Sequence, residues 1–166
     1  MEMHDNLPSL YIGSSSEGLE VAEYLQQALE GHCEATIWSQ GVFGLSQGTL
    51  ESLVAACKQF DFATLVLTPD DMLTKRGSRK RAARDNVLFE LGLFMGSLGR
   101  ERTFIVYCRD EKIDLPSDLA GVTAATFPKR VDGNMAAAIN PVAIKIREAI
   151  KKARGKKGTG ESTSFC

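Results

Sequence analysis

Short apolar runs alternate along the chain with longer segments in which apolar residues recur every three or four positions. The short runs predict β-strands. They are Ser9–Ile12, Ala35–Trp38, Phe62–Leu67, Thr103–Tyr107 and Thr123–Phe127. The third run is almost purely apolar, which indicates a strand that is buried on both faces of a sheet.

The longer segments have the period of amphipathic helices. They are Glu17–Glu30, Thr49–Phe60, Asp85–Leu98 and Met135–Arg154. Ser15 or Ser16 suits the N-cap of the first helix, and Gly31 suits its end. Pro141 is expected either to kink the last helix or to delay its start.

This alternation of strands and helices predicts an α/β domain with a parallel sheet covered by helices on both faces. Five strands favour the flavodoxin-like order 2-1-3-4-5. Ligands of such sheets bind outside the carboxyl ends of the strands, where the direction of winding reverses. The order therefore brings Gly13–Glu17, Thr68–Asp71 and the Gly-rich segment Trp38–Gly48 around one site.

The length of 166 residues suits one domain, for which we expect residues 1–154, followed by a polar, disordered tail, Gly155–Cys166. The net charge of −1 gives no general attraction to nucleic acid or membranes. Without a membrane-spanning run or an apolar leader in Met1–Pro8, we expect a cytoplasmic protein. The basic segment Lys75–Arg84 is interpreted as solvated charge rather than as a phosphate site.

The cysteines and histidines do not have the spacing of metal ligands. Four cysteines are scattered along the chain, and His4 and His32 are the only histidines. We therefore expect no metal site, and we expect Cys57 and Cys108 to be buried free thiols.

A glycine and three serines follow the first predicted strand. Gly13 allows a sharp turn, and the hydroxyls of Ser14, Ser15 and Ser16, next to a helix N-terminus, suit ribose or phosphate oxygens. The alternative is a simple helix cap. The cluster lacks the pattern of a Walker loop or of a dinucleotide fingerprint.

Glu90 is the only charged residue in the apolar helical run Val87–Met95. A helix that is apolar almost all round is expected to be largely buried, and a buried carboxylate is costly unless it has a partner or a function. The alternatives are a solvent-facing position or an ion pair with an arginine. Gly92 and Gly96 suggest close packing of another backbone or of a partner.

Aromatic and acidic residues flank the same expected site. Trp38 and Phe43 suit stacking on a flat base, although Trp38 equally suits a plug at the edge of the core. Asp70 and Asp71 stand where a phospho-receiver domain has its acceptor. Serines occupy the positions after the first strand where a receiver needs acidic residues, which argues against that class.

Taken together, these segments resemble the bacterial TIR-like domains, first described as predicted nucleotide-binding domains, of anti-phage systems and bacterial STING fusions. The resemblance covers about Leu10 to Phe127. The matching segments are Ile12–Gly18, Trp38, Gly41–Phe43, Phe60–Ala63, Thr68–Asp71, Arg84–Phe94 and Leu115–Leu119.

The resemblance implies a TIR fold and NAD+ glycohydrolase activity, which releases nicotinamide and ADP-ribose or a cyclic form. The family's catalytic glutamate maps to Glu90, and its flexible loop to Trp38–Gly48. NAD+ is then the substrate, with no further cofactor. Arg84, Asp71 and Asp85 join Gly13, the three serines, Trp38 and Phe43 as the expected substrate-binding set.

The resemblance also implies assembly into a homo-oligomer or filament and control by a fused or separate sensor. Two other functions stay open on the sequence. One is a nucleoside N-glycosidase or deoxyribosyltransferase, which shares the architecture and a catalytic glutamate. The other is a non-catalytic TIR adaptor, which leaves Glu90 unexplained.

Overall fold

The computed structural model describes residues 6–38, 50–69, 87–119 and 121–156. Its centre is a five-stranded sheet in the order β2-β1-β3-β4-β5, with every pair of neighbours parallel. The strands are β1 Ser9–Ser14, β2 Glu34–Ile37, β3 Phe62–Val66, β4 Thr103–Cys108 and β5 Thr123–Phe127. The predicted fold class and strand order are confirmed.

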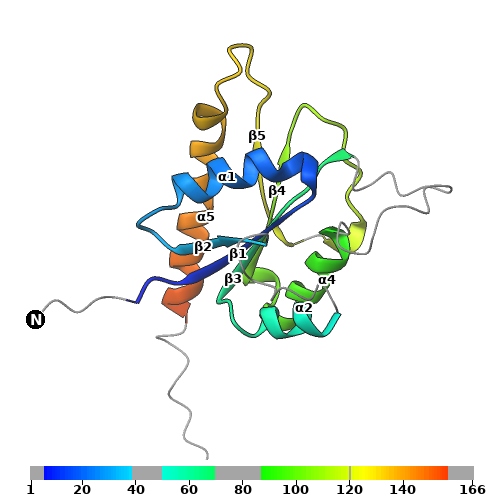
Figure 1. Cartoon of the computed structure of the whole chain (residues 1–166), viewed down its shortest axis with the longest axis vertical. Helices are drawn as coiled ribbons and strands as arrows, with labels where there is room; N and C mark the ends of the chain where they lie inside the picture. The colour runs from blue at the N-terminus through cyan, green and yellow to red at the C-terminus, as the bar shows by residue number, and fades with distance from the viewer. Residues whose placement is uncertain (1–5, 39–49, 70–86, 120, 157–166) are drawn as a thin grey trace, which may run out of the picture.

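Two layers of helices enclose the sheet (Figure 1). The α-helices are α1 Leu19–Ala28, α2 Leu50–Cys57, α4 Val87–Leu98 and α5 Met135–Lys156. Short 3-10 turns span Ser16–Gly18, Arg100–Arg102 and Ser117–Leu119. Within the described residues, no helix has both the length and the hydrophobicity needed to cross a bilayer.

Each face of the sheet has its own apolar core. Leu10, Ile12 and Phe62 point toward α1 and α5, whereas Tyr11, Ala63 and Leu65 point toward α2 and α4. This division follows from the alternation of side chains along a strand. All five residues of β3 are buried, as expected for a central strand covered on both sides.

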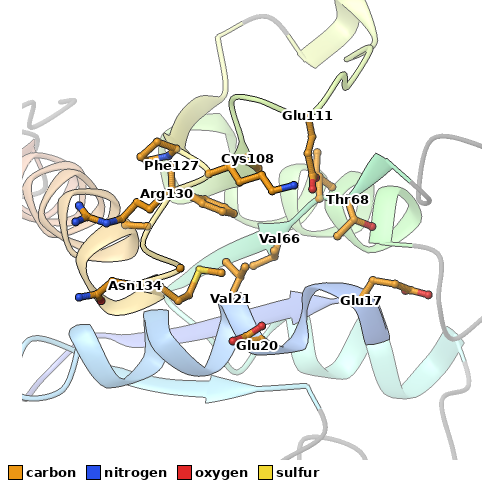
Figure 2. Close-up of a pocket in the computed structure, with 16 residues that line it drawn as sticks. Glu17, Glu20, Val21, Val66, Thr68, Cys108, Glu111, Phe127, Arg130 and Asn134 are labelled. Atoms are coloured by element: carbon orange, nitrogen blue, oxygen red, sulfur yellow. The ribbon is translucent and has the colours of Figure 1, made fainter.

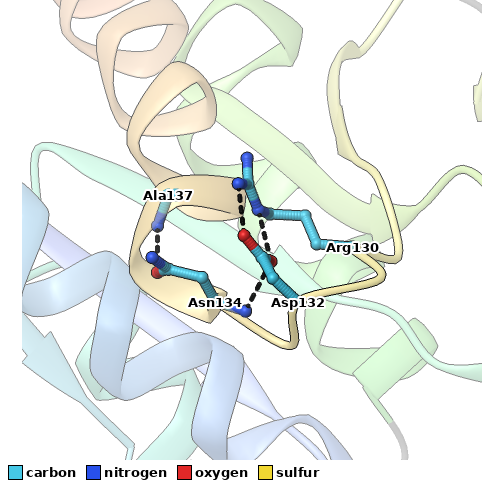
Figure 3. Close-up of polar contacts among 4 residues, drawn as sticks. All are labelled: Arg130, Asp132, Asn134 and Ala137. Carbon is cyan, nitrogen blue, oxygen red and sulfur yellow. Dashed lines mark hydrogen bonds and ion pairs between the residues drawn. The ribbon is translucent and has the colours of Figure 1, made fainter.

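The last helix begins at a cap that the sequence does not single out (Figure 3). The Asn134 side chain accepts a hydrogen bond from the Ala137 backbone N–H at 3.0 Å, which is the N-cap arrangement. Asp132 accepts from the Asn134 N–H and also forms a two-pronged ion pair with Arg130. This pair holds the pKa of the Asp132 carboxyl well below its usual range. The turn therefore fixes where α5 starts.

Several predicted boundaries need correction. Pro141 lies inside α5, so it does not delay the start of that helix. Gly155 and Lys156 belong to α5 and not to a disordered tail. Helix α2 ends at Cys57, three residues before the predicted Phe60. The first helix opens as a 3-10 turn whose cap is Ser15, with no hydrogen bond from the cap side chain.

Candidate active site

Glu90 is buried on the inner face of α4, with 8% of its surface exposed. Val87, Glu90, Leu91 and Phe94 form that face, at the spacing of one helical stripe. The carboxylate is directed at the sheet and not at open solvent. The glutamate therefore occupies a position that an apolar side chain would normally fill.

The carboxylate lies against the backbone of β1. A Cβ atom placed on Gly13 would come within 2.6 Å of Glu90 Oε2 and within 2.6 Å of Leu65 Cδ1, distances that real Cβ atoms do not adopt. Gly13 is the penultimate residue of β1, at the strand's carboxyl end. A side chain at this position would force the Glu90 carboxylate and the Leu65 side chain to shift, because they occupy its space. The site therefore lies at the end of the sheet where parallel α/β domains bind ligands.

The Tyr11 hydroxyl donates a hydrogen bond to Glu90 Oε2 at 3.1 Å. Burial, followed by the charge of Glu90, raises the pKa of the Tyr11 phenol well above its ordinary value. The phenol therefore stays protonated and remains a donor. Sequence reasoning missed this residue because Tyr11 reads as one more apolar position in a buried strand.

The Cys57 thiol belongs to the same buried environment. Burial raises the pKa of Cys57, and the nearby charge of Glu90 raises it further. Cys33, Cys57 and Cys108 are all buried free thiols, which confirms the prediction for the last two. A neutral thiol adds no competing charge beside the carboxylate.

The three serines do not gather on one side of the sheet. Since Gly13 faces Glu90, strand alternation directs Ser14 to the opposite face, where the Cβ of Ser14 lies 3.3 Å from the position of a Cβ on Gly18. The Ser14 Oγ is buried without a hydrogen-bond partner in the described part of the chain. Ser15 Oγ lies 3.4 Å from Thr68 Oγ1, and Ser16 is exposed. Their role in binding ribose or phosphate stays a prediction.

Trp38 follows β2 and is partly buried. Its side chain packs against both core clusters, as a plug at the edge of the sheet does. The indole N–H is buried and has no partner among residues 6–38, 50–69, 87–119 and 121–156. Stacking of Trp38 on a base stays a prediction.

Other predicted site residues lie outside the described residues. They are Phe43, Asp70, Asp71, Arg84 and Asp85, together with the basic segment 75–84. In the described portion of the structure, no three His, Cys, Asp or Glu side chains come close enough to hold a metal ion.

The described structure contains a cavity of about 330 Å³ (Figure 2). Its apolar wall comes from Val21 of α1 and from Val66, Cys108 and Phe127 at the ends of β3, β4 and β5. Glu20 and other charged side chains lie at its rim. Glu17 and Thr68, from two of the segments that were predicted to surround one site, line this cavity, whereas the sequence did not single out its apolar wall. Its lining residues Phe127 and Ala138 belong to the core on the α1 and α5 side of the sheet, whereas Leu67 belongs to the core on the Glu90 side.

The outer face of α4 is less buried than the sequence predicts. Phe89 is 47% exposed, and Gly92 and Gly96 are exposed. A Cβ on either glycine meets nothing within 4 Å in the described structure. Neither glycine packs closely against another described part of this chain. Packing of the glycines against a partner stays a prediction.

The sequence of this chain is similar to those of bacterial effector proteins. The family model described as "CAP12/Pycsar effector protein, TIR domain" matches residues 9–129. CD-NTase-associated protein 12 of Flavobacterium daejeonense is 40% identical over 122 residues, which cover 74% of this chain and 39% of that protein. Pycsar effector protein XpPycTIR of Xanthomonas perforans is 43% identical over 150 residues, which cover 89% of this chain and 49% of that protein.

A third relative is similar to this chain over a comparable length. Pycsar effector protein PaPycTIR of Pseudomonas aeruginosa is 38% identical over 146 residues, which cover 86% of this chain and 47% of the relative. The chain thus spans about half or less of the length of these relatives. The matched region contains β1 to β5, and with them Gly13 and Glu90.

Proposed function

Since the chain belongs to the TIR domain family of CAP12/Pycsar effector proteins, we propose that it cleaves the bond between nicotinamide and ribose in NAD+. The resemblance to bacterial TIR-like domains inferred from the sequence is confirmed by the family model. The observation that supports the activity best is the buried Glu90 carboxylate, held against Gly13 at the carboxyl end of β1.

The chemistry of the reaction explains why a carboxylate is wanted there. Nicotinamide carries a positive charge while it is attached to ribose and leaves as a neutral base, so its departure needs little acid catalysis. The electrons of the broken bond go to nicotinamide, and the ribose becomes an oxocarbenium-like cation. A fixed negative charge beside the sugar stabilises that cation in the transition state. Water, or a group of the same molecule in a cyclic product, then completes the reaction at the anomeric carbon.

We assign the electrostatic role to Glu90. Its burial supports this role, because a charge interacts more strongly with a developing cation where water is scarce. Gly13 has no side chain between the carboxylate and the strand end. The hydroxyls of Ser15 and Ser16 lie at the same end of the sheet and suit the ribose or diphosphate oxygens.

The names of the relatives also bear on the biological setting of the activity. The relatives bear the names of effector proteins, and we propose that this chain is the effector part of a bacterial anti-phage response. A sensor, on the same polypeptide or on a separate one, then controls assembly of TIR domains into the active form.

The test is nicotinamide release from NAD+ at high protein concentration by the wild-type chain, Glu90→Gln and Glu23→Gln. Glu23 is exposed on α1 and provides a matched loss of one carboxylate. We expect the wild type and Glu23→Gln to release nicotinamide at equal rates and Glu90→Gln to lose at least about 100-fold, the usual cost of removing one transition-state charge contact. Equal rates for all three proteins would remove Glu90 from this role.

The same assay distinguishes the other enzyme class. Purine and pyrimidine nucleosides are incubated beside NAD+ under identical conditions. We expect turnover of NAD+ alone, and release of a base from nucleosides without loss of NAD+ would assign the chain to the N-glycosidases instead.

A further inference from the structure

Tyr11 is a polar residue in one of the most apolar places of the molecule. It has no exposed surface and lies in the middle of β1, between two neighbouring strands. A buried phenol needs a hydrogen-bond partner, since its hydroxyl otherwise loses its contacts with water. The partner that Tyr11 has is Glu90 Oε2, at 3.1 Å.

The ring of Tyr11 is fixed from two sides. It stacks on Phe94, with centroids 4.4 Å apart and an angle of 30° between the planes, and it meets Phe60 edge-on at 5.5 Å. Phe94 lies one helical turn after Glu90, so the ring that holds Tyr11 and the carboxylate that it binds belong to the same face of α4. These ring contacts fix the position of the Tyr11 hydroxyl, so the hydrogen bond forms in one orientation of the Glu90 side chain.

While the Glu90 carboxyl is ionised, the Tyr11 hydroxyl is the donor of this hydrogen bond. Because burial and the Glu90 charge raise the pKa of Tyr11, the phenol remains the donor and the carboxylate the acceptor. A hydrogen bond that is donated to an ionised carboxyl favours its ionised form.

We propose that Tyr11 is a positioning residue for NAD+ cleavage, whose hydroxyl holds the Glu90 carboxylate against Gly13 and keeps it ionised. The inference rests on the proposed function and deepens it. Tyr11 acts through Glu90 and not on the substrate. Among the described residues, Tyr11 from β1 and Cys57 from α2 are the titratable groups whose protonation responds to Glu90.

The direct test is Tyr11→Phe, which keeps the ring and removes only the oxygen. We expect kcat to fall about 10- to 100-fold, the range for a lost hydrogen bond to a charged group, with KM changed less than about twofold. Because protonation of Glu90 becomes easier without the donor, the acid limb of the kcat profile should move to higher pH. A kcat and an acid limb equal to those of the wild type would overturn the inference.

Tyr24→Phe is the matched control. Tyr24 is a partly buried tyrosine that packs against the core on the opposite face of the sheet. Loss of its hydroxyl should leave kcat and the pH profile unchanged. The thermal midpoint of both variants is measured as well, and a Tyr11→Phe protein that folds like the wild type and still loses kcat fits positioning.

A second measurement does not depend on activity. The Glu90 carboxyl carbon is followed by ¹³C NMR over a pH titration, with the resonance identified by its absence from Glu90→Gln. We expect the midpoint in Tyr11→Phe to lie about one pH unit or more above that of the wild type. Equal midpoints would refute the inference even if NAD+ is cleaved. A shifted midpoint in a chain that releases no nicotinamide would refute the proposed function and leave the Tyr11–Glu90 contact established.

Discussion

At the scale of single residues, Gly13, Tyr11 and Glu90 form one unit around a buried carboxylate. Gly13 leaves the space, Tyr11 supplies the donor, and Glu90 fills the space with charge. A side chain at position 13 would displace the carboxylate, and loss of the Tyr11 hydroxyl would leave Glu90 Oε2 without this donor. A charge placed in this way is costly for folding, so a carboxylate here is better explained by chemistry than by stability.

Replacement of Gly13 by alanine tests this unit. The added Cβ would collide with Glu90 Oε2 and Leu65 Cδ1 at 2.6 Å. We expect at least a tenfold loss of NAD+ cleavage, together with a loss of about 1–3 kcal/mol in the free energy of unfolding. The control is Gly155→Ala, where the new Cβ meets nothing within 4 Å. Full activity of Gly13→Ala would show that the carboxylate does not depend on this contact.

The sequence could predict Glu90 because a single charge in an apolar helical run is visible without a structure. It could not predict Tyr11, whose partner is 79 positions away along the chain. Nor could it place Ser14, because the face of a strand to which a residue points depends on where the strand begins. The structure directs Ser14 to the face opposite Glu90, and a place for Ser14 in the site stays a prediction.

At the scale of elements, α1 and α5 begin in different ways. Helix α5 starts at a side-chain cap, whereas α1 starts through a 3-10 turn with no such hydrogen bond. The periods of the sequence predicted the middle of every described helix correctly. The ends were less predictable, since they depend on single hydrogen bonds and not on a repeated pattern.

The cap of α5 gives a prediction of stability. Asn134→Ala should lower the free energy of unfolding by about 1 kcal/mol, because the Ala137 N–H loses its acceptor. Asn140→Ala is the control: Asn140 is exposed inside the same helix, where alanine is the better helix former, so the free energy should stay equal or rise by a few tenths of a kcal/mol. Chemical denaturation measures both. Equal losses at the two positions would contradict the cap.

At the scale of the whole molecule, the described part of the chain exposes apolar side chains on the outer faces of α2 and α4. α2 and α4 lie side by side on the Glu90 face of the sheet (Figure 1). Leu50 and Val54 of α2 and Phe89 of α4 are among its exposed large apolar side chains. With the exposed glycines of α4, they provide a surface on which a second copy can pack. This arrangement agrees with the proposed activation by assembly.

Assembly predicts that NAD+ cleavage per molecule rises with protein concentration. Val54→Lys should move this rise to higher concentration, because it places a charge among the exposed apolar side chains of α2 and α4. Ile144→Lys is matched in exposure, 41% against 39% for Val54, and lies on α5 across the sheet, so it should leave the curve unchanged. Light scattering follows the same samples. A constant activity per molecule across a wide dilution series would contradict activation by assembly.

The most direct measurement is a crystal structure of Glu90→Gln with NAD+ bound, since this variant is expected to bind the substrate without cleaving it. We expect the anomeric carbon of the nicotinamide ribose within about 3.5 Å of the residue 90 side chain, the range of a reactive arrangement. NAD+ bound instead in the cavity beside Val21 and Phe127, with its ribose far from residue 90, would exclude Glu90 as the residue that stabilises the ribose cation.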